Sequence, residues 1–401
     1  GAAVSRFAGR FRQGGVEGLA LDAAFRYETM DARVDHPVGR HVLSVGGRLE
    51  RTPYRYFLEP GSDFADRLVQ LDVEGVATSS ALFLEDRWRP VPAVEARLGL
   101  RAEKHGAFAW RWLPRAGLAV EPSDRLRVSL AGGRYAQGFT SLRNEEAGLA
   151  SIVAYDLLVP PTSALPGGWD VTVGLQWHGD VWSVRTDAYW KRLEDVPLAP
   201  REPDPATAPI YLGPEDFGVG DGRVRGLELG VRGGVGGWDV AASYRLQKEE
   251  RRAGDLTWTP RSDRTHRLTL AGRRRWGEGS VNVALSWTSG QPFTPVSALV
   301  PGVAGYDADG RALPEDFDLP LLGPHNSARL PGYLRLDVGV RGRWRWSVAG
   351  RDIEVEPYLS VMNVLNRKNV LWGEYAGGRT VKLEYGPQLP VLPSFGLRFR
   401  F

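Results

Sequence analysis

Histidine side chains are the first candidates for chemistry in this chain, because they bind metal ions and transfer protons near neutral pH. The chain has six histidines, and their spacings do not match those of the ligands of a protein metal site. Scattered positions of this kind favour solvated side chains near strand ends over metal ligands. The six are His36, His41, His105, His178, His266 and His325.

An acidic stretch near residue 310 resembles a calcium-binding loop. Asp307-Ala-Asp-Gly310 supplies two carboxylates and a turn glycine, and Glu315, Asp316 and Asp318 follow it. An EF-hand loop also needs a third acidic ligand and a glutamate at fixed spacings, and the residues here do not meet that requirement. We therefore expect a solvated acidic loop, and the sequence predicts neither a metal site nor a cofactor.

Enzymatic chemistry has little support in the sequence. Serines are common at positions expected to face a polar interior, but no histidine and acidic residue accompany one in a recognisable local pattern. The glycine-rich segment Gly233–Gly237 precedes no helix, so it is predicted to be a turn and not a phosphate-binding loop. The chain contains no cysteine, which excludes disulfides and cysteine–metal sites. The chain is predicted not to be an enzyme.

The C-terminal residues 393–401 indicate that β-strands position any functional side chain of this chain. Phe395, Leu397, Phe399 and Phe401 fall on one side of a strand, and Arg398 falls on the other with its polar or small neighbours. No apolar run reaches the roughly 18 residues of a membrane helix, so any membrane crossing must be made by strands. The pattern predicts the closing strand of an antiparallel transmembrane β-barrel, with these apolar residues facing lipid and forming a signal for the barrel assembly machinery.

The same two-residue alternation recurs almost to the end of the chain. Small or charged residues occupy most of the second faces, which a water-filled or plugged lumen tolerates better than a dry core. We therefore predict an all-β fold in which residues 1–401 form one outer-membrane β-barrel domain of about 16 strands. Near the N-terminus, 2–12, 16–28 and 39–51 are expected to be strands. Clear examples further on are residues 94–101, 126–131, 171–177, 182–190, 227–231, 238–244, 281–287, 334–340 and 353–361.

Connections between these strands alternate in length, as they do in outer-membrane barrels with periplasmic turns and outer loops. Tryptophans lie at many strand ends, as interfacial girdles require, although the chain is also simply rich in tryptophan, with 14. The net charge of +3 is dispersed, which argues against a nucleic-acid partner. The short links are 121–124, 178–180, 233–237 and 276–279, and the long ones are 137–168, 193–222, 248–264, 290–331 and 368–392; the tryptophans are Trp88, Trp169, Trp182, Trp190, Trp238, Trp276 and Trp344.

From about residue 41 onward, the order of the strand motifs resembles the C-terminal part of the TonB-dependent receptor barrel. Each motif is weak by itself, but their order and spacing extend over some 360 residues. The motifs are His41–Gly47, Ala81–Trp88, Ala96–Arg101, Pro114–Leu118, Leu126–Leu130, Tyr135–Phe139, Val224–Leu229, Ser289–Thr294, Leu330–Asp337, Leu359–Asn366 and Pro393–Phe401.

This resemblance implies active import of a nutrient, such as an iron–siderophore, cobalamin or a glycan, through the outer membrane of a Gram-negative-type cell. Such receptors have about 22 strands and a plug domain inside the barrel, on which the TonB complex pulls. We see neither a plug domain nor a TonB box in this sequence, and we expect both, with about six further strands, N-terminal to this chain. A passive porin is the alternative, since about 16–18 strands form an open channel, and a purely structural outer-membrane component is a third possibility.

Ligand contacts are expected from the outer loops and the upper lumen wall, where a substrate arrives. We select large or charged loop side chains, because such residues make good anchors. The alternative for each is that it packs the loops together. The candidates are Arg143, Tyr155, Tyr211, Phe217, Tyr306 and Tyr375.

Overall fold

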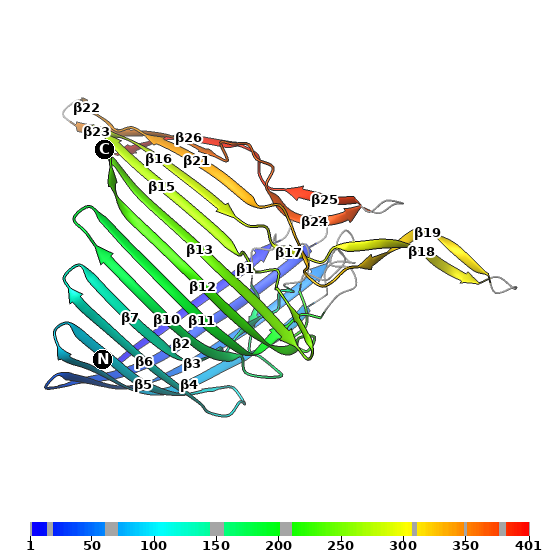
Figure 1. Cartoon of the computed structure of the whole chain (residues 1–401), viewed down its shortest axis with the longest axis horizontal. Helices are drawn as coiled ribbons and strands as arrows, with labels where there is room; N and C mark the ends of the chain where they lie inside the picture. Colours follow the sequence, from blue (N-terminus) through cyan, green and yellow to red (C-terminus); the bar gives the residue numbers. More distant parts are fainter. Residues whose placement is uncertain are drawn as a thin grey trace.

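The protein is a single curved antiparallel sheet of long, tilted strands, with smaller hairpins at the end where the long connections lie (Figure 1). The computed structural model describes residues 2–13, 19–60, 71–144, 156–200, 211–306, 311–348, 351–376 and 382–400. Across these ranges, no helix is both long enough and apolar enough to pass through a membrane.

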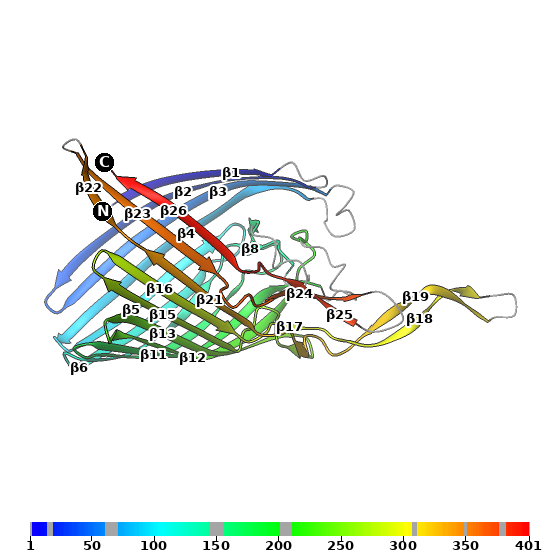
Figure 2. The same cartoon turned by 90° about the horizontal axis from the view of Figure 1, so that it is seen from above.

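Consecutive long strands pair with each other from β1 to β26, always antiparallel. The main sheet has 18 strands, but the short β14 pairs only with the last residues of β13, beyond the part that pairs with β15, and β22 continues β21 along β23. Sixteen positions remain in the described part of the sheet, which agrees with the predicted number of about 16. Within the same residues, β1 and β26 are not paired with each other, so these two strands form the edges of the sheet (Figure 2).

The strands fall into a long set, which forms the main sheet, and a short set, which lies mostly in the connections. The long strands are β1 Ala2–Gln13, β2 Leu19–Val38, β3 His41–Pro60, β4 Leu71–Val91, β5 Val94–His105, β6 Arg111–Ser123, β7 Leu126–Ala136, β10 Gly167–His178, β11 Trp182–Leu198, β12 Gly218–Val235, β13 Trp238–Ala253, β15 His266–Trp276, β16 Gly279–Thr288, β21 Tyr333–Arg341, β23 Arg351–Met362 and β26 Leu392–Arg400. The short ones are β8 Thr140–Ser141, β9 Leu158–Val159, β14 Leu256–Trp258, β17 Pro292–Phe293, β18 Val296–Tyr306, β19 Ala312–Leu322, β20 Ala328–Arg329, β22 Trp344–Val348, β24 Val370–Ala376 and β25 Lys382–Pro387.

One face of the sheet is apolar and exposed. The strand registers place Leu175 opposite Val128 and Thr186, and Thr186 opposite Leu229, so these side chains share a face. Leu98, Leu82 and Leu397 are each at least 60% exposed on the same face, whereas a soluble sheet would bury such residues. We refer to it as the exterior face. All seven tryptophans selected from the sequence fall on it: Trp88, Trp169, Trp182, Trp190, Trp238, Trp276 and Trp344.

The opposite face, which we call the interior face, is lined by paired charges. An arginine and an acidic residue two positions further along the same strand recur on several strands, because such residues share a face. Arg33 and Asp35 are 2.7 Å apart, and Arg185 and Asp187 are 2.6 Å apart. At the edge strand, Arg398 and Arg400 contact glutamates of β23 from this face, while Phe395, Leu397 and Phe399 lie on the exterior face. The residue Phe401 lies outside the described residues.

Some of the short turns contain glycines that adopt a left-handed backbone, including Gly236, Gly237 and Gly277. The predicted turn Gly233–Gly237 is tighter in the structure, since β12 continues to Val235 and β13 begins at Trp238. Gly236 and Gly237, with φ of 57° and 79°, therefore make the whole turn, and residues with a Cβ are disfavoured at such angles.

Two sequence expectations about element boundaries are wrong. The N-terminal strands are longer than predicted, because β2 runs without a break from Leu19 to Val38 and β3 from His41 to Pro60. The long connections are also partly strand: 290–331 contains the hairpin of β18 and β19, and 368–392 contains that of β24 and β25. Figure 1 shows the β18–β19 hairpin reaching far from the sheet.

The two faces predict opposite responses to a charge placed at adjacent positions of β12. Leu229→Arg puts a charge on the exterior face, where the cost near the middle of a bilayer is about 2–4 kcal/mol. We expect this variant to lose most of its folded, heat-modifiable form on cold gel electrophoresis of outer-membrane fractions.

The matched control is Glu228→Arg, one residue away on the interior face. It should reach near-parental folded levels, because that face already carries arginines. Equal folding of the two variants would show that the exterior face does not contact lipid.

Candidate functional site

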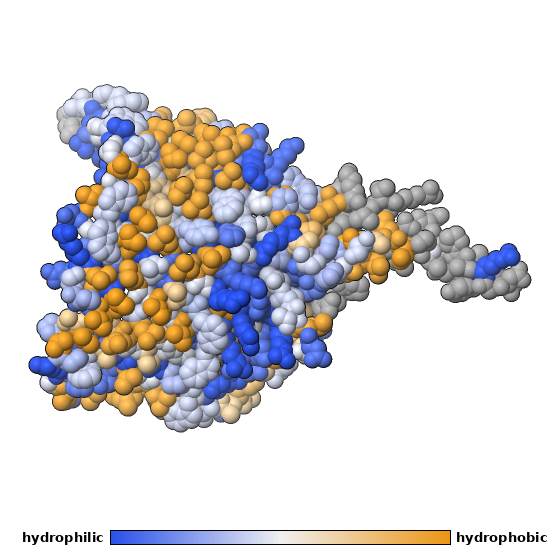
Figure 3. All heavy atoms as spheres, viewed as in Figure 1, coloured by the Kyte–Doolittle hydropathy of each residue, from blue (hydrophilic) through white to orange (hydrophobic). Residues whose placement is uncertain are grey.

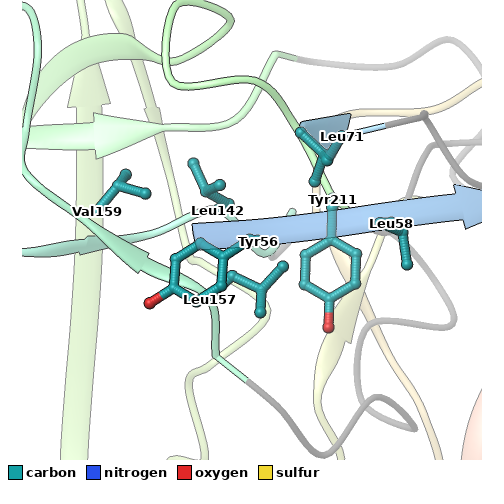
Figure 4. Close-up of a cluster of buried hydrophobic side chains, with 7 residues drawn as sticks. All are labelled: Tyr56, Leu58, Leu71, Leu142, Leu157, Val159 and Tyr211. Atoms are coloured by element: carbon teal, nitrogen blue, oxygen red, sulfur yellow. The ribbon is translucent and has the colours of Figure 1, made fainter. Parts of the chain in front are cut away.

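A buried cluster of loop and strand side chains packs against the interior face at the end of the sheet where the long connections lie. Tyr56 and Leu58 of β3 and Leu71 of β4 face the interior and pack with residues of the connections 137–166 and 199–217. The Tyr56 hydroxyl also donates a hydrogen bond of 3.0 Å to the Leu158 carbonyl. Figure 4 shows the seven side chains of this loop cluster, which are Tyr56, Leu58, Leu71, Leu142, Leu157, Val159 and Tyr211.

Backbone hydrogen bonds hold these loops in one arrangement. β8 pairs with β9, and Arg143 forms an isolated bridge with Tyr211. The Leu142 amide donates to Leu157, and the Leu212 amide donates to the Leu142 carbonyl, both at 2.9 Å. Two connections that are far apart in sequence therefore form a small sheet of their own, which is a rigid platform for side chains directed into the interior.

A cavity of about 430 Å³ lies beside this platform, at the ends of β7, β10, β11 and β13 next to the long connections. The volume is within the range of small-molecule sites. Tyr135 and Lys191 contribute from the interior face of strands, and Arg143, Phe217 and Trp258 contribute from loops or short strands. Strands and a hydrogen-bonded platform thus position aromatic and basic side chains around one space.

The lining of the cavity carries more positive than negative charge. Arg143, Lys191 and Arg251 line it, and Asp170 is the acidic residue among the described lining residues. Arg143 lies 3.3 Å from Asp156, and Arg251 lies 2.6 Å from Glu249, whereas Lys191 takes part in no ion pair within the described residues. Asp170 faces Lys191 across the pair of strands β10 and β11, so the net positive charge of the lining comes from the three basic residues together. Basic groups beside aromatic rings suit a ligand with anionic groups and flat apolar parts.

A buried carboxylate anchors the loops next to the cavity. Asp263 is fully buried, and it accepts hydrogen bonds from the Glu249 amide at 3.2 Å, the Thr265 hydroxyl at 3.0 Å and the Arg329 guanidinium at 2.6 Å. It therefore joins β13, the following connection and β20. Burial, with Arg261 and Arg329 nearby, lowers the pKa of the neighbouring Arg264 to about 10.

The structure brings three of the six predicted ligand residues together. Arg143 and Phe217 line the cavity. Tyr211 is only 2% exposed and lies in the loop cluster, where burial raises its pKa to about 12, so in this structure it packs the loops. Tyr306 and Tyr375 belong to the separate hairpins β18–β19 and β24–β25, and Tyr155 lies outside the described residues.

The cavity residues Tyr135, Asp170 and Lys191 were not selected from the sequence, because selection was limited to loops. Arg251 was not selected either, although it lies in the connection expected at 248–264, and the structure places it in β13. Their positions could have been recognised from the sequence, because each lies on the polar face of a strand, near the end that leads into a long connection. Trp258 carried no comparable signal, because its position depends on β14 turning back along β13.

The histidines have ordinary structural partners where the structure shows them. His41 makes a 2.8 Å hydrogen bond to Asp86 and stacks on Trp88, and His266 bonds the Tyr244 hydroxyl at 2.8 Å. The described residues contain no group of three or more histidine, cysteine or acidic side chains able to hold a metal ion. The acidic stretch 307–310 lies outside them.

Residues 5–364 match the family described as TonB dependent receptor-like, beta-barrel, so the chain belongs to this family. The match confirms the resemblance seen in the strand motifs. No curated protein matches the sequence significantly.

Solved structures share this fold at low sequence identity. The ferripyoverdine receptor FpvA of P. aeruginosa, in a complex with a heterologous pyoverdine, aligns with 99% of this chain and 53% of its own, at 12% identity and a TM-score of 0.61. The ferric yersiniabactin uptake receptor FyuA from Yersinia pestis aligns with 100% and 58%, at 11% identity and a TM-score of 0.59. The copper transporter OprC aligns with 95% and 56%, at 14% identity and a TM-score of 0.59. The chain spans little more than half the length of these proteins.

The loop cluster predicts a large effect from a single buried leucine. Leu142→Ala removes a fully buried side chain, which costs about 2–5 kcal/mol when the space cannot collapse. We expect residues 137–166 to lose hydrogen-exchange protection and to be cut faster by an added protease, while the barrel stays folded.

The matched control is Leu158→Ala in the same loop, where the side chain is 44% exposed. It should change protection little. If Leu142→Ala leaves protection of the loop unchanged, the cluster does not hold the loops over the interior.

Proposed function

We propose that this chain is the barrel of a TonB-dependent importer in the outer membrane of a Gram-negative-type bacterium. The observation that carries the proposal is the packing of loops against the interior face beside a ligand-sized cavity, in a barrel of this family. A cavity at the outer end is where a nutrient arrives from the medium. The roles of lipid and the barrel assembly machinery as partners, and of Phe395, Leu397, Phe399 and Phe401 as an assembly signal, belong to the same proposal.

The side chains around the cavity favour one of the nutrient classes expected from the family. Lys191, Arg143 and Arg251 suit carboxylate or other anionic groups, and the rings of Tyr135 and Trp258 offer flat apolar contacts. These features support an anionic metal chelate, such as an iron–siderophore, over a neutral glycan. FpvA and FyuA, whose structures share this fold, are receptors for ferric chelates.

The passive porin is the weaker alternative. A strand number of 16 would suit a porin, but a diffusion channel needs an open lumen and a closed ring of strands. In the described residues, loops pack against the interior face, and β1 and β26 leave two unpaired edges. A separate plug domain of roughly 100 residues and about six further strands would complete an importer of the family's size, and these belong to the proposal.

Uptake measurements test the proposal. In cells that carry the full-length protein, uptake of a labelled ferric chelate is expected to require TonB and to stop when a protonophore removes the proton gradient. Lys191→Gln should raise the half-saturating concentration about tenfold, the effect of one charge-assisted hydrogen bond.

Lys104→Gln is the matched control, because Lys104 lies on the exterior face. It should leave uptake unchanged. Uptake that persists without TonB and rises linearly with concentration would establish a porin instead.

The orientation of the sheet gives a further expectation. Single cysteines at Ala304, in the β18–β19 hairpin, and at Ser123, at the end of β6, lie at opposite ends of the sheet. An impermeant maleimide should label only the first in intact cells, because long loops face outward. Labelling of both after cell lysis is the control, and preferential labelling of position 123 in intact cells would reverse the orientation.

A further inference from the structure

Strand β11 is interrupted near its loop end by a β-bulge. Its pairing with β12 is regular as far as Leu193, and it resumes at Val196. Glu194 and Asp195 together lie opposite a single residue of β12, Asp221, which is the two-against-one arrangement of a bulge. We call Glu194 and Asp195 the β11 bulge. At this end of the sheet, the surface changes from hydrophobic to hydrophilic residues toward the loops (Figure 3).

The bulge changes which residues of β11 face the interior. β12 is regular here, and its even-numbered residues face the interior, as Glu228 does. Val196 lies opposite Gly220 of β12. Because directly opposite residues share a face, Val196 faces the interior, and so does Leu198 two residues further on. A Cβ on Gly220 would come within 2.3 Å of Leu198 Cδ1, which places the leucine on the same side.

An unbroken strand would direct an acidic residue toward the cavity of the candidate site. Lys191 and Leu193 face the interior before the bulge, and simple alternation would continue with Asp195. In the structure, Leu193, Val196 and Leu198 line the cavity, whereas neither residue of the bulge does. The bulge therefore places apolar side chains beside Lys191 where alternation alone would place a carboxylate.

The backbone of the bulge adopts an unfavourable conformation. Asp195 has a φ of 56°, in the left-handed region that residues with a Cβ rarely adopt. The other described non-glycine residues with such angles are three asparagines in connections: Asn326, Asn363 and Asn366. A strained residue persists only where its surroundings hold it, and such residues cluster at functional sites. Specific contacts should therefore hold the β11 bulge.

Two arginines from other strands make these contacts. Arg111 of β6 lies 3.2 Å from Asp195, and Arg134 of β7 lies 3.1 Å from Glu194. The strands are ordered β6, β7, β10 and β11, so both arginines reach across β10. Gly167 of β10 leaves room for this, since a Cβ there would meet Arg111 Nη1 at 3.1 Å. Both carboxylates are thus paired with arginines that do not line the cavity.

We propose that the β11 bulge sets the charge of the cavity, and that Arg111 is the positioning residue that holds Asp195 outside it. The three basic lining residues are then opposed by one acidic residue, Asp170, among the described residues of the lining. The cavity therefore attracts anions. The proposal rests on the proposed import function for the purpose of this charge, whereas the geometry of the bulge involves no ligand.

The test measures the electrostatic potential of the cavity in the purified full-length protein. Residues 1–401 contain no cysteine, and any cysteine elsewhere is first replaced by serine. A reporter cysteine at Thr140, which lines the cavity, is modified by anionic sulfonatoethyl or cationic trimethylammonioethyl methanethiosulfonate. Arg111→Gln should lower the anion-to-cation ratio of rates about tenfold, because Asp195 then turns toward the cavity and acts on the two reagents in opposite directions. Arg111→Lys should restore most of the ratio, since it keeps an ion pair.

The direct effect of the arginine charge is separated by repeating the measurement in the Asp195→Asn background. Asparagine tolerates the left-handed backbone and carries no charge. Arg111→Gln should therefore change the ratio by less than about twofold in this background. An equal fall in both backgrounds would show that Arg111 acts by its own charge, and an unchanged ratio with Asp195 present would show that the arginine does not position it. Either result would overturn the proposal.

A reporter cysteine at Ser123, at the opposite end of β6, is the matched control. Its ratio should be the same in every variant, and heat-modifiable mobility should confirm that each variant is folded. A fall at both reporters would indicate a general disturbance of the barrel and would refute the specific role of Arg111. Because neither a ligand nor uptake is measured, these outcomes are independent of the importer assignment.

Discussion

The structure depends on the two-residue period of a β-strand, which places alternate side chains on opposite faces of one sheet. Most long strands whose side chains are described use this period to keep leucine, valine and tryptophan on the exterior face, and several carry charged pairs such as Arg185 and Asp187 on the interior face. A slip of one residue in any register would exchange these two sets. The apolar exterior therefore holds the registers in place, and the registers in turn position each charged side chain at a defined height along the interior.

The position of a residue along its strand determines which groups its side chain can contact. At the outer end, the interior charges meet the loop platform, and Lys191 and Arg143 line one cavity. On the other side of the same strands and at nearly the same level, Arg192 and Arg225 face outward. One end of the sheet thus presents charged residues on both faces, which are separated by a single layer of backbone.

The sequence was most informative where the period is undisturbed. In residues 94–101 and 171–177 the sequence alternation predicts the apolar and the polar face, and the strand registers place these faces as expected. Connections were predicted poorly, because their structure comes from distant contacts. Tyr211 looked like a ligand anchor, yet it packs against Leu58 and Leu71 from strands about 150 residues earlier. The sequence around Asp263 did not indicate its three hydrogen bonds to separate elements. The paired strands β18 and β19 lie in a segment that the sequence predicted to be a loop.

The loops and the sheet are therefore stabilised by different interactions. The sheet is stabilised by backbone pairing and, when in lipid, by its apolar exterior, so exchanging one exposed leucine for another apolar residue changes little. The loops are stabilised by a small buried cluster and by a few buried polar residues such as Asp263, whose partners are specific. Phe217 of the loops and Lys191 of a strand line the same cavity. Under the proposed import function, loop residues could therefore be exchanged to suit a different ligand without altering the strand residues that hold the sheet together.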